Sequence, residues 1–330
     1  MRPFNFISAE NKQQAIQGIT KNKNSKFLGG GTNLVDLMKE NVERPENIIE
    51  VANLEYKTVI QNTKGSYTIG AMLSNAETAN HNLIRTHYPL LSMAMLSAAT
   101  AQIRNMATNG GNLLQRTRCP YFFEVSMPCN KREPGSGCGA KNGMNALHAI
   151  FGYSDKCVAV NPSDMCVALA ALNAEVEVAT TSGESRMIAF TDFHRLPGDN
   201  PEKDTNLGEG ELITAIHLPK PIYQEHYHYL KIRERSSYAF ALVSVAAGLQ
   251  IKNGKISDVG LAMGGVAHKP WKLTTAEEFL KGKTPNESNF EKAAELAMKD
   301  AKPLSENGYK VPMGEKGIIR ALHMAYNKNI

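Results

Sequence analysis

All five cysteines of this 330-residue chain lie between residues 119 and 166, at Cys119, Cys129, Cys138, Cys157 and Cys166. Thiolates are ligands for zinc and for iron–sulfur clusters, so their concentration in one segment indicates a shared metal-binding role. The segment with the first three is rich in Pro, Gly and Asn and has no long apolar period. It is therefore expected to be an irregular loop held by something other than a core. The odd count favours metal thiolates over a disulfide framework.

The spacing of these cysteines leaves three interpretations open. Between Cys119 and Cys157 the pattern is C-x9-C-x8-C-x18-C, without the close C-x2-C pair with which most structural zinc sites begin. The pattern also departs from ferredoxin spacing, although four thiolates on a flexible loop can close around an iron–sulfur cluster. The residues alone therefore leave an iron–sulfur cluster, a zinc ion and inert thiols as alternatives.

Two glycine-rich turns precede the cysteines. In the first, the glycines 29–31 with Thr32 and Asn33 follow a short apolar strand and precede a helix. Residues without a Cβ let backbone N–H groups approach an anion, and the two side chains and the helix N-terminus add donors. A pyrophosphate would fit there, although the spacing matches neither the dinucleotide-binding G-x-G-x-x-G nor the P-loop. A tight turn without a ligand is the alternative.

A second glycine element, from Arg104 to Asn112, follows an apolar helical segment in an equivalent setting. Two such loops suit a dinucleotide with an extended diphosphate. The sequence has no G-x-S-x-G and no H-E-x-x-H motif. His226 and His228 alternate along a strand without carboxylates that would define a metal site, and His268 is expected to have no catalytic role. The chemistry is therefore expected to come from bound cofactors.

These motifs resemble the FAD-binding domain of the molybdenum hydroxylase family, which includes xanthine dehydrogenases, carbon monoxide dehydrogenases and aldehyde oxidoreductases. FLGGGTNLVDLMK and IRNMATNGGNLLQ look like the two phosphate loops of that family. NPSDM at 161–165, GELI at 210–213 and KIRERSSYAFALVSVA from Lys231 follow in the family's order. The segment GGVA at 264–267, with Pro270, resembles the C-terminal flavoprotein domain, so the resemblance covers nearly the whole chain.

The resemblance implies a set of FAD-binding residues. Those around the diphosphate would be Lys26, Phe27, Leu28, Gly29, Gly30, Gly31, Thr32, Asn33 and Leu34, faced by Thr108, Gly111 and Asn112. Asp164 would contact the adenosine side, Ile213 would pack near the flavin, and Lys231 would contact the isoalloxazine end. A cation there can stabilise the charge of the reduced ring. From the residues alone, Asp164 is equally well explained as a helix cap and Lys231 as a solvated strand residue.

The cysteine segment resembles a particular branch of the family. Most of its flavoproteins lack such an insertion, but periplasmic aldehyde oxidoreductases and 4-hydroxybenzoyl-CoA reductases carry an additional [4Fe–4S] cluster in the flavin subunit. LLQRTRCPYFFE and PCNKREPGSGC look like the aldehyde oxidoreductase form, which implies the ligands Cys119, Cys129, Cys138 and Cys157. Cys166 lies in an apolar helical segment and is expected to be a small core residue. The nearby cations could raise the cluster's potential through their charge, but are expected to be solvated; they are Arg116, Arg118, Lys131 and Arg132.

The helices and strands expected around these motifs indicate an α+β chain of two domains. Residues 1–222 would form a two-lobed FAD-binding domain of the PCMH type, with lobes at 1–55 and 56–222 and the iron–sulfur loop at about 115–160. Residues 223–330 would form a smaller domain of antiparallel sheet and helices, like the C-terminal domain of CO dehydrogenase flavoproteins.

Within these domains, apolar patterns predict several elements in detail. One helix is expected from Tyr88 to near Arg104, and Ser163 or Asp164 is expected to cap another. A long strand-like run extends over residues 238–251, and the last helical segment covers residues 317–328.

Composition and charge limit the function further. The 37 basic and 32 acidic residues are mixed along the chain, without the Lys/Arg stripe that nucleic acid binding requires. No stretch approaches the roughly 20 apolar residues of a membrane span, so membrane insertion is not expected. Residues 1–30 lack the apolar core of a secretion signal, so we expect no export signal in this chain itself.

The sequence thus predicts the FAD- and [4Fe–4S]-containing electron-transfer subunit of a molybdenum-dependent aldehyde oxidoreductase. By resemblance, a large molybdenum-cofactor subunit would oxidise the aldehyde, and a small [2Fe–2S] subunit would relay electrons to FAD and an unknown acceptor. The complex would be a heterotrimer or its dimer, in the periplasm through an exported partner subunit, with the cytoplasm as the alternative. Two other functions stay open: a stand-alone FAD oxidoreductase like UDP-N-acetylenolpyruvoylglucosamine reductases, and a zinc-stapled scaffold whose glycine turns bind nothing.

Overall fold

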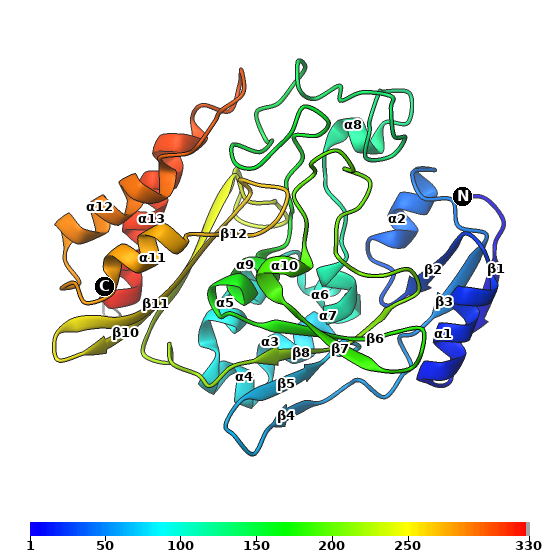
Figure 1. Ribbon diagram of the computed structural model, residues 1–330, viewed down its shortest axis with the longest axis horizontal. Coiled ribbons are helices and arrows are strands. Elements are labelled where there is room, and N and C mark those ends of the chain that lie inside the picture. The colour runs from blue at the N-terminus through cyan, green and yellow to red at the C-terminus, as the bar shows by residue number, and fades with distance from the viewer. Residues whose placement is uncertain (328–330) are drawn as a thin grey trace.

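The computed structural model describes residues 1–327, which have the α+β architecture expected from the sequence (Figure 1). Their strands form a small parallel sheet near the N-terminus, a five-stranded antiparallel sheet and a four-stranded antiparallel sheet near the C-terminus. Within this range, no helix has both the length and the apolar character needed to cross a membrane.

The first lobe is built on the parallel sheet, in the order β1-β3-β2. Its strands are β1 (Asn5–Ser8), β2 (Ser25–Leu28) and β3 (Asn47–Glu50), and its helices are α1 (Lys12–Lys21) and α2 (Leu34–Lys39). Ala15 and Ile16 of α1 pack in one buried cluster with Ile49 of β3. Because β2 ends at Leu28 and α2 begins at Leu34, the three glycines form the connection at the carboxyl edge of the sheet, as the sequence predicted.

The second lobe is built on the five-stranded sheet, in the order β4-β5-β8-β6-β7. Its strands are β4 (Val59–Gln61), β5 (Tyr67–Gly70), β6 (Glu175–Ala179), β7 (Ser185–Ala189) and β8 (Leu212–Leu218). Its helices are α3 (Asn75–Asn80), α4 (Asn82–His87), α5 (Pro89–Ser97), α6 (Ala101–Met106), α7 (Asn109–Leu113), α9 (Asp164–Ala171) and α10 (Phe190–Phe193). Every residue of α9 is buried, because this apolar helix packs between α5 and the C-terminal sheet.

The prediction of one helix from Tyr88 to near Arg104 was wrong, because the chain forms two helices there, α5 and α6. Between them Ala99 adopts φ +46°, and the side chain of Thr100 accepts a hydrogen bond from the N–H of Ile103 as the N-cap of α6. The break turns the carbonyl of Ala98 toward Arg104, whose Nη1 donates to it at 2.7 Å. It therefore positions the start of the second glycine element.

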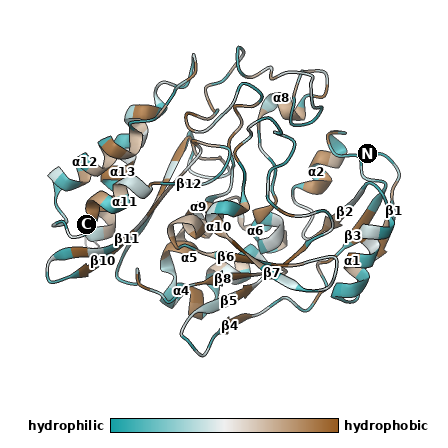
Figure 2. Ribbon diagram, in the orientation of Figure 1, coloured by the Kyte–Doolittle hydropathy of each residue, from teal (hydrophilic) through white to brown (hydrophobic). Residues whose placement is uncertain are grey.

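The C-terminal part consists of the four-stranded sheet, in the order β12-β11-β10-β9, with helices on one face (Figure 1). Its elements are β9 (His226–Ile232), β10 (Val243–Lys252), β11 (Lys255–Gly264), β12 (Trp271–Lys272), α11 (Thr274–Leu280), α12 (Glu287–Met298) and α13 (Lys310–Tyr326). Val245 and Leu249 of β10 pack with those helices, whereas Ala246 belongs to the core on the other face. Apolar residues accordingly colour the inner strands in Figure 2.

Two sequence predictions in this part need correction or restriction. The strand expected over residues 238–251 begins only at Val243, because Tyr238 adopts φ +51° and lies in an exposed loop. The last predicted helical segment is confirmed as far as Tyr326, whereas its end at Lys328 lies outside the described residues.

The cysteine segment is irregular, as predicted, and contains only the short helix α8 (Pro120–Phe123) (Figure 1). It does have a small apolar core, in which Phe122 and Val158 pack with Leu37 of α2, so the expectation of a loop held without any core was wrong. Farther along, the N–H of Phe151 donates to the carbonyl of Val266 at 3.0 Å. The segment therefore joins both lobes to the C-terminal sheet.

Candidate functional site

A pocket of about 1840 Å³ lies where the two lobes meet the C-terminal sheet. Both glycine loops line it, and so does every residue that the sequence assigned to cofactor binding. Those residues are Lys26, Phe27, Leu28, Gly29, Gly30, Gly31, Thr32, Asn33, Leu34, Thr108, Gly111, Asn112, Asp164, Ile213 and Lys231. The fold thus brings together segments that are more than two hundred residues apart in the chain.

The two glycine loops touch each other across the floor of this pocket. A Cβ on Gly30 would lie 1.7 Å from the carbonyl oxygen of Met106, and one on Gly29 would lie 2.5 Å from Oγ1 of Thr108. Gly31 adopts φ +72°, which side-chain-bearing residues rarely adopt. Glycine is therefore required here for the close approach of the two loops and for the turn itself.

The pocket presents donors suited to an anionic ligand. Asn33 lines it, and its Oδ1 accepts the N–H of Arg116 at 2.9 Å. Its Nδ2 is buried and has no hydrogen-bond partner among the described residues. A buried donor without a partner costs about 1–3 kcal/mol, which a diphosphate oxygen would offset. The donors and the glycine turn therefore fit a dinucleotide.

Asp164 and Lys231 form a buried ion pair in the pocket wall. Their Oδ2 and Nζ atoms are 2.8 Å apart, and the side chains are only 6% and 4% exposed. The hydroxyl of Tyr229 donates to the other carboxylate oxygen at 2.7 Å, and burial together with that carboxylate raises the pKa of Tyr229. Ser163 caps α9, with its Oγ accepting the N–H of Cys166 at 3.1 Å. Asp164 is therefore not the cap, and Lys231 is not a solvated strand residue.

The mutual contact of Asp164 and Lys231 also bears on their expected roles. Because the two charges are paired, Asp164 and Lys231 lie side by side in the pocket wall. Their assignment to different ends of the cofactor stays a prediction. Ile213, on β8, is 3% exposed and contributes an apolar surface to the same pocket.

A second, much smaller cavity is lined by Cys119, Cys129, Cys138 and Cys157. The first, second and fourth of these are buried and the third is half-buried. Cys166 lies in α9 outside this cavity and is fully buried, as the sequence predicted. The fold therefore gathers the four cysteines that were expected to be ligands and excludes the fifth.

Burial strongly affects these thiols. It raises the pKa of Cys119 to about 12 and the pKa of Cys157 to about 11, and the neighbouring cysteines add to both shifts. A bound metal would have to supply the positive charge that deprotonates them. Across residues 1–327, no three His, Cys, Asp or Glu side chains converge closely enough to hold a single metal ion.

A histidine that the sequence did not single out lies beside one of the four cysteines. Nε2 of His148 is 3.1 Å from Sγ of Cys119, and the side chain is buried. The only sequence signal was its position between the third and fourth cysteines.

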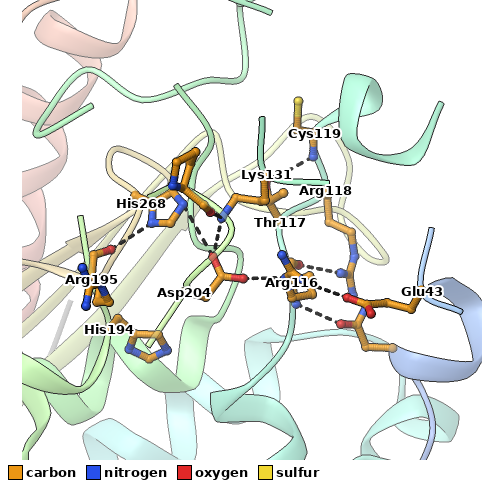
Figure 3. Close-up of polar contacts among 12 residues, drawn as sticks. Glu43, Arg116, Thr117, Arg118, Cys119, Lys131, His194, Arg195, Asp204 and His268 are labelled. Carbon is orange, nitrogen blue, oxygen red and sulfur yellow. Dashed lines mark hydrogen bonds and ion pairs between the residues drawn. The ribbon is translucent and has the colours of Figure 1, made fainter. Parts of the chain in front are cut away.

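A network of charges connects the cysteine segment to the pocket (Figure 3). Asp204 lies at its centre, where Oδ1 contacts Nζ of Lys131 and Oδ2 lies 2.5 Å from Nε of Arg116. Nε2 of His268 lies 3.5 Å from the same carboxylate. Arg116 also reaches Glu43 at 2.5 Å, so the network extends into the first lobe.

This network shapes the electrostatics of the site. Burial alone would disfavour the ionised form of Asp204, but Lys131 and Arg116 outweigh it and hold the pKa of that carboxyl well below its usual range. The side chain of Lys131 is 1% exposed, and Arg118 is half-buried with its guanidinium 5.3 Å from the ring centre of Phe240. The expectation of a solvated cationic side chain was therefore wrong for Lys131.

Two glycine loops that meet beneath a dinucleotide-sized pocket, on a two-lobed domain followed by an antiparallel sheet, define an FAD-binding flavoprotein. Residues 2–221 match the FAD binding domain in molybdopterin dehydrogenase, and residues 227–323 match the CO dehydrogenase flavoprotein C-terminal domain. The chain belongs to the family of FAD-binding medium subunits of molybdenum hydroxylases, and is thus an oxidoreductase subunit. The resemblance stated from the sequence is confirmed.

Several members of this family are similar to the chain over most of its length. The aldehyde oxidoreductase FAD-binding subunit PaoB of Escherichia coli K12 is 41% identical over 98% of both chains. The glyceraldehyde dehydrogenase medium chain of Sulfolobus acidocaldarius is 26% identical, over 92% of this chain and 90% of its own. In fold, the chain is similar to carbon monoxide dehydrogenase from Hydrogenophaga pseudoflava, with a TM-score of 0.78 at 20% identity, covering 99% of this chain and 98% of that one.

Proposed function

We propose that the chain is the FAD- and [4Fe–4S]-containing electron-transfer subunit of a molybdenum-dependent aldehyde oxidoreductase. The aldehyde class is supported by the 41% identity to PaoB, which is named as an aldehyde oxidoreductase subunit. One structural observation carries the cluster: four cysteines line one cavity, and Cys119 and Thr117 line both that cavity and the flavin pocket. A single short segment thus separates the two proposed cofactors.

Different residues of the chain would hold different parts of FAD. The turn 29–31 and the amide of Asn33 would hold the diphosphate, with Thr108, Gly111 and Asn112 on the facing side. Ile213 would cover apolar parts of the cofactor, and the Asp164–Lys231 pair would provide fixed charge beside it. Bound FAD supplies the capacity to accept electrons and pass them on.

The four cysteine thiolates would hold the [4Fe–4S] cluster, whose ligands can be widely spaced in sequence. Apolar side chains such as Phe122 and Val158 also line their cavity, and Lys131 lies in its wall. A cation beside the ligands offsets part of the negative charge of four thiolates.

The proposal includes partner subunits. A large molybdenum-cofactor subunit would oxidise the substrate, and a small [2Fe–2S] subunit would pass electrons to this chain, which delivers them to an acceptor. Support comes from relatives named as medium chains or FAD-binding subunits, among them the glyceraldehyde dehydrogenase medium chain. We further propose a periplasmic location through an exported partner subunit.

Metal and flavin analysis of the anaerobically purified protein tests this proposal. We expect FAD, iron and acid-labile sulfide, together with two co-purifying subunits. Cys119→Ser should lose the iron and sulfide, whereas Cys166→Ala should retain them, because Cys166 lies outside the cysteine cavity. Zinc without iron, sulfide or FAD would refute the proposal in favour of a scaffold. An active monomer would support a stand-alone FAD oxidoreductase.

A further inference from the structure

His148 lines the flavin pocket next to the cysteine cavity, and its contact with a cysteine is not explained by the four thiolate ligands. It lies in the cysteine segment between Cys138 and Cys157, and its side chain points into the cysteine region, with Nε2 3.1 Å from Sγ of Cys119. That separation is short for a contact between nitrogen and sulfur and fits an N–H···S hydrogen bond. The imidazole is buried, so water does not compete for the bond.

The C-terminal part of the chain holds this histidine in place. The carbonyl oxygen of His148 accepts hydrogen bonds from Nδ2 of Asn307 at 3.1 Å and from Nζ of Lys310 at 2.9 Å. Both donors are buried, and Lys310 also donates to the carbonyl of Gly265 at 2.6 Å. Burial of a lysine and an asparagine costs free energy unless their N–H groups are hydrogen-bonded. These hydrogen bonds therefore fix the backbone of His148 in the fold.

The hydrogen-bonding capacity of the ring sets the direction of the bond. A neutral imidazole carries one N–H, on either Nε2 or Nδ1. Nδ1 has no hydrogen-bond partner among the described residues. A thiolate sulfur bound to iron can only accept, so the arrangement favours the tautomer with the proton on Nε2.

We propose that His148 is a positioning residue that donates a hydrogen bond to the sulfur of Cys119 and thereby raises the reduction potential of the cluster. The inference rests on the cluster proposed above. If the cluster is bound as proposed, its reduction by one electron from the proposed [2Fe–2S] subunit would increase the negative charge on its sulfur ligands, and no covalent bond would form or break. A fixed N–H donor stabilises that added charge, and hydrogen bonds to the sulfurs are among the factors that set the potential.

An EPR-monitored redox titration of the purified complex tests the role of His148. His148→Leu removes the donor and should shift the midpoint potential of the cluster to a lower value, with FAD and iron contents unchanged. His148→Gln keeps a side-chain N–H of similar reach and should recover part of the shift. His228→Leu is the matched control, because this half-buried histidine of β9 lines neither cavity and should leave the potential unchanged.

Pulsed EPR of the reduced wild-type complex, labelled with ¹⁵N-histidine, gives a readout that needs no variant. We expect one weakly coupled histidine nitrogen, which His148→Leu abolishes. A strong coupling, typical of nitrogen bound directly to iron, or no coupling at all would overturn the inference. An unchanged potential in His148→Leu with full iron content would also overturn it, while leaving the cluster itself intact. Absence of iron and sulfide from the wild type would instead refute the proposed function.

Discussion

Replacement of Asp204 by asparagine should destabilise the folded chain, because Lys131 and Arg116 share the charge of this carboxylate. The side chains of these two cations are 1% and 18% exposed. After the substitution, Nζ of Lys131 would keep its hydrogen bond to the carbonyl of Pro201 at 2.8 Å, and Arg116 would keep its ion pair with Glu43. Neither remaining contact replaces the charge lost at the centre of the network.

The size of this effect follows from the geometry. Removal of one partner from a buried ion pair costs about 3–5 kcal/mol. Because Asp204 is 25% exposed and both cations keep another partner, we expect a loss below that range, about 2–3 kcal/mol. Unfolding a chain of 330 residues has an entropy of about 0.7 kcal/mol/K, so the melting temperature should fall by about 3–4 °C.

The loss should also depend on pH. The pKa of Asp204 is held below its usual range in the folded chain by Lys131 and Arg116, acting against burial. A depressed carboxyl pKa contributes stability that is present above the unfolded value of about 3.9 and is lost as the pH falls below it. The difference between wild type and Asp204→Asn should therefore be constant from neutral pH to about pH 5 and decrease in more acidic solution.

Thermal unfolding followed by circular dichroism and flavin fluorescence provides the assay. Asp199→Asn is the matched control, because Asp199 is exposed in the same loop and should change the melting temperature little. If Asp204→Asn and Asp199→Asn had the same melting temperature at neutral pH, the charge network would not stabilise the fold. An equal deficit at neutral and acidic pH would refute the electrostatic explanation.

Two further substitutions test other parts of the structure. Gly30→Ala should weaken FAD binding by about 2 kcal/mol, or about 30-fold in Kd, since its Cβ would meet the carbonyl of Met106 at 1.7 Å. Equilibrium flavin binding measures this, and Gly308→Ala, with open space around its Cβ, should bind FAD normally. Lys310→Met tests a lysine whose pKa burial lowers to about 7. In the unfolded chain this lysine keeps its proton up to pH about 10, so the unfolded state binds more protons than the folded state above pH 7. The free energy of unfolding of the wild type, measured by urea denaturation, should therefore rise relative to that of the variant from pH 7 to pH about 9.5. A difference that stays constant with pH would contradict this expectation.

The glycine loops and the cysteines could be predicted because their signals are local. Three successive glycines between a strand and a helix dictate a turn at that place, whatever the rest of the chain does. The break at Ala99 had no such signal, because alanine favours helices and only the surrounding packing sets its φ of +46°.

Asp204 and His148 could not be found from the sequence for a different reason. Asp204 contacts Lys131 across 73 positions of the chain, and His148 contacts Cys119 across 29. Neither residue belongs to a motif, and each acquires its role only when distant segments meet in the folded chain. For the same reason the sequence could name the four cysteines that line one cavity but not the residues that set their electrostatic surroundings.

The attachment of the cysteine segment to the last third of the chain has a consequence for biosynthesis. The N–H of Ile150 donates to the carbonyl of Val266 at 2.9 Å, and the backbone of His148 is held by Asn307 and Lys310. During synthesis, the residues that make these contacts leave the ribosome well after the cysteines. The cysteine segment therefore gains its last contacts late, and the proposed cluster would have time to be inserted before those contacts form.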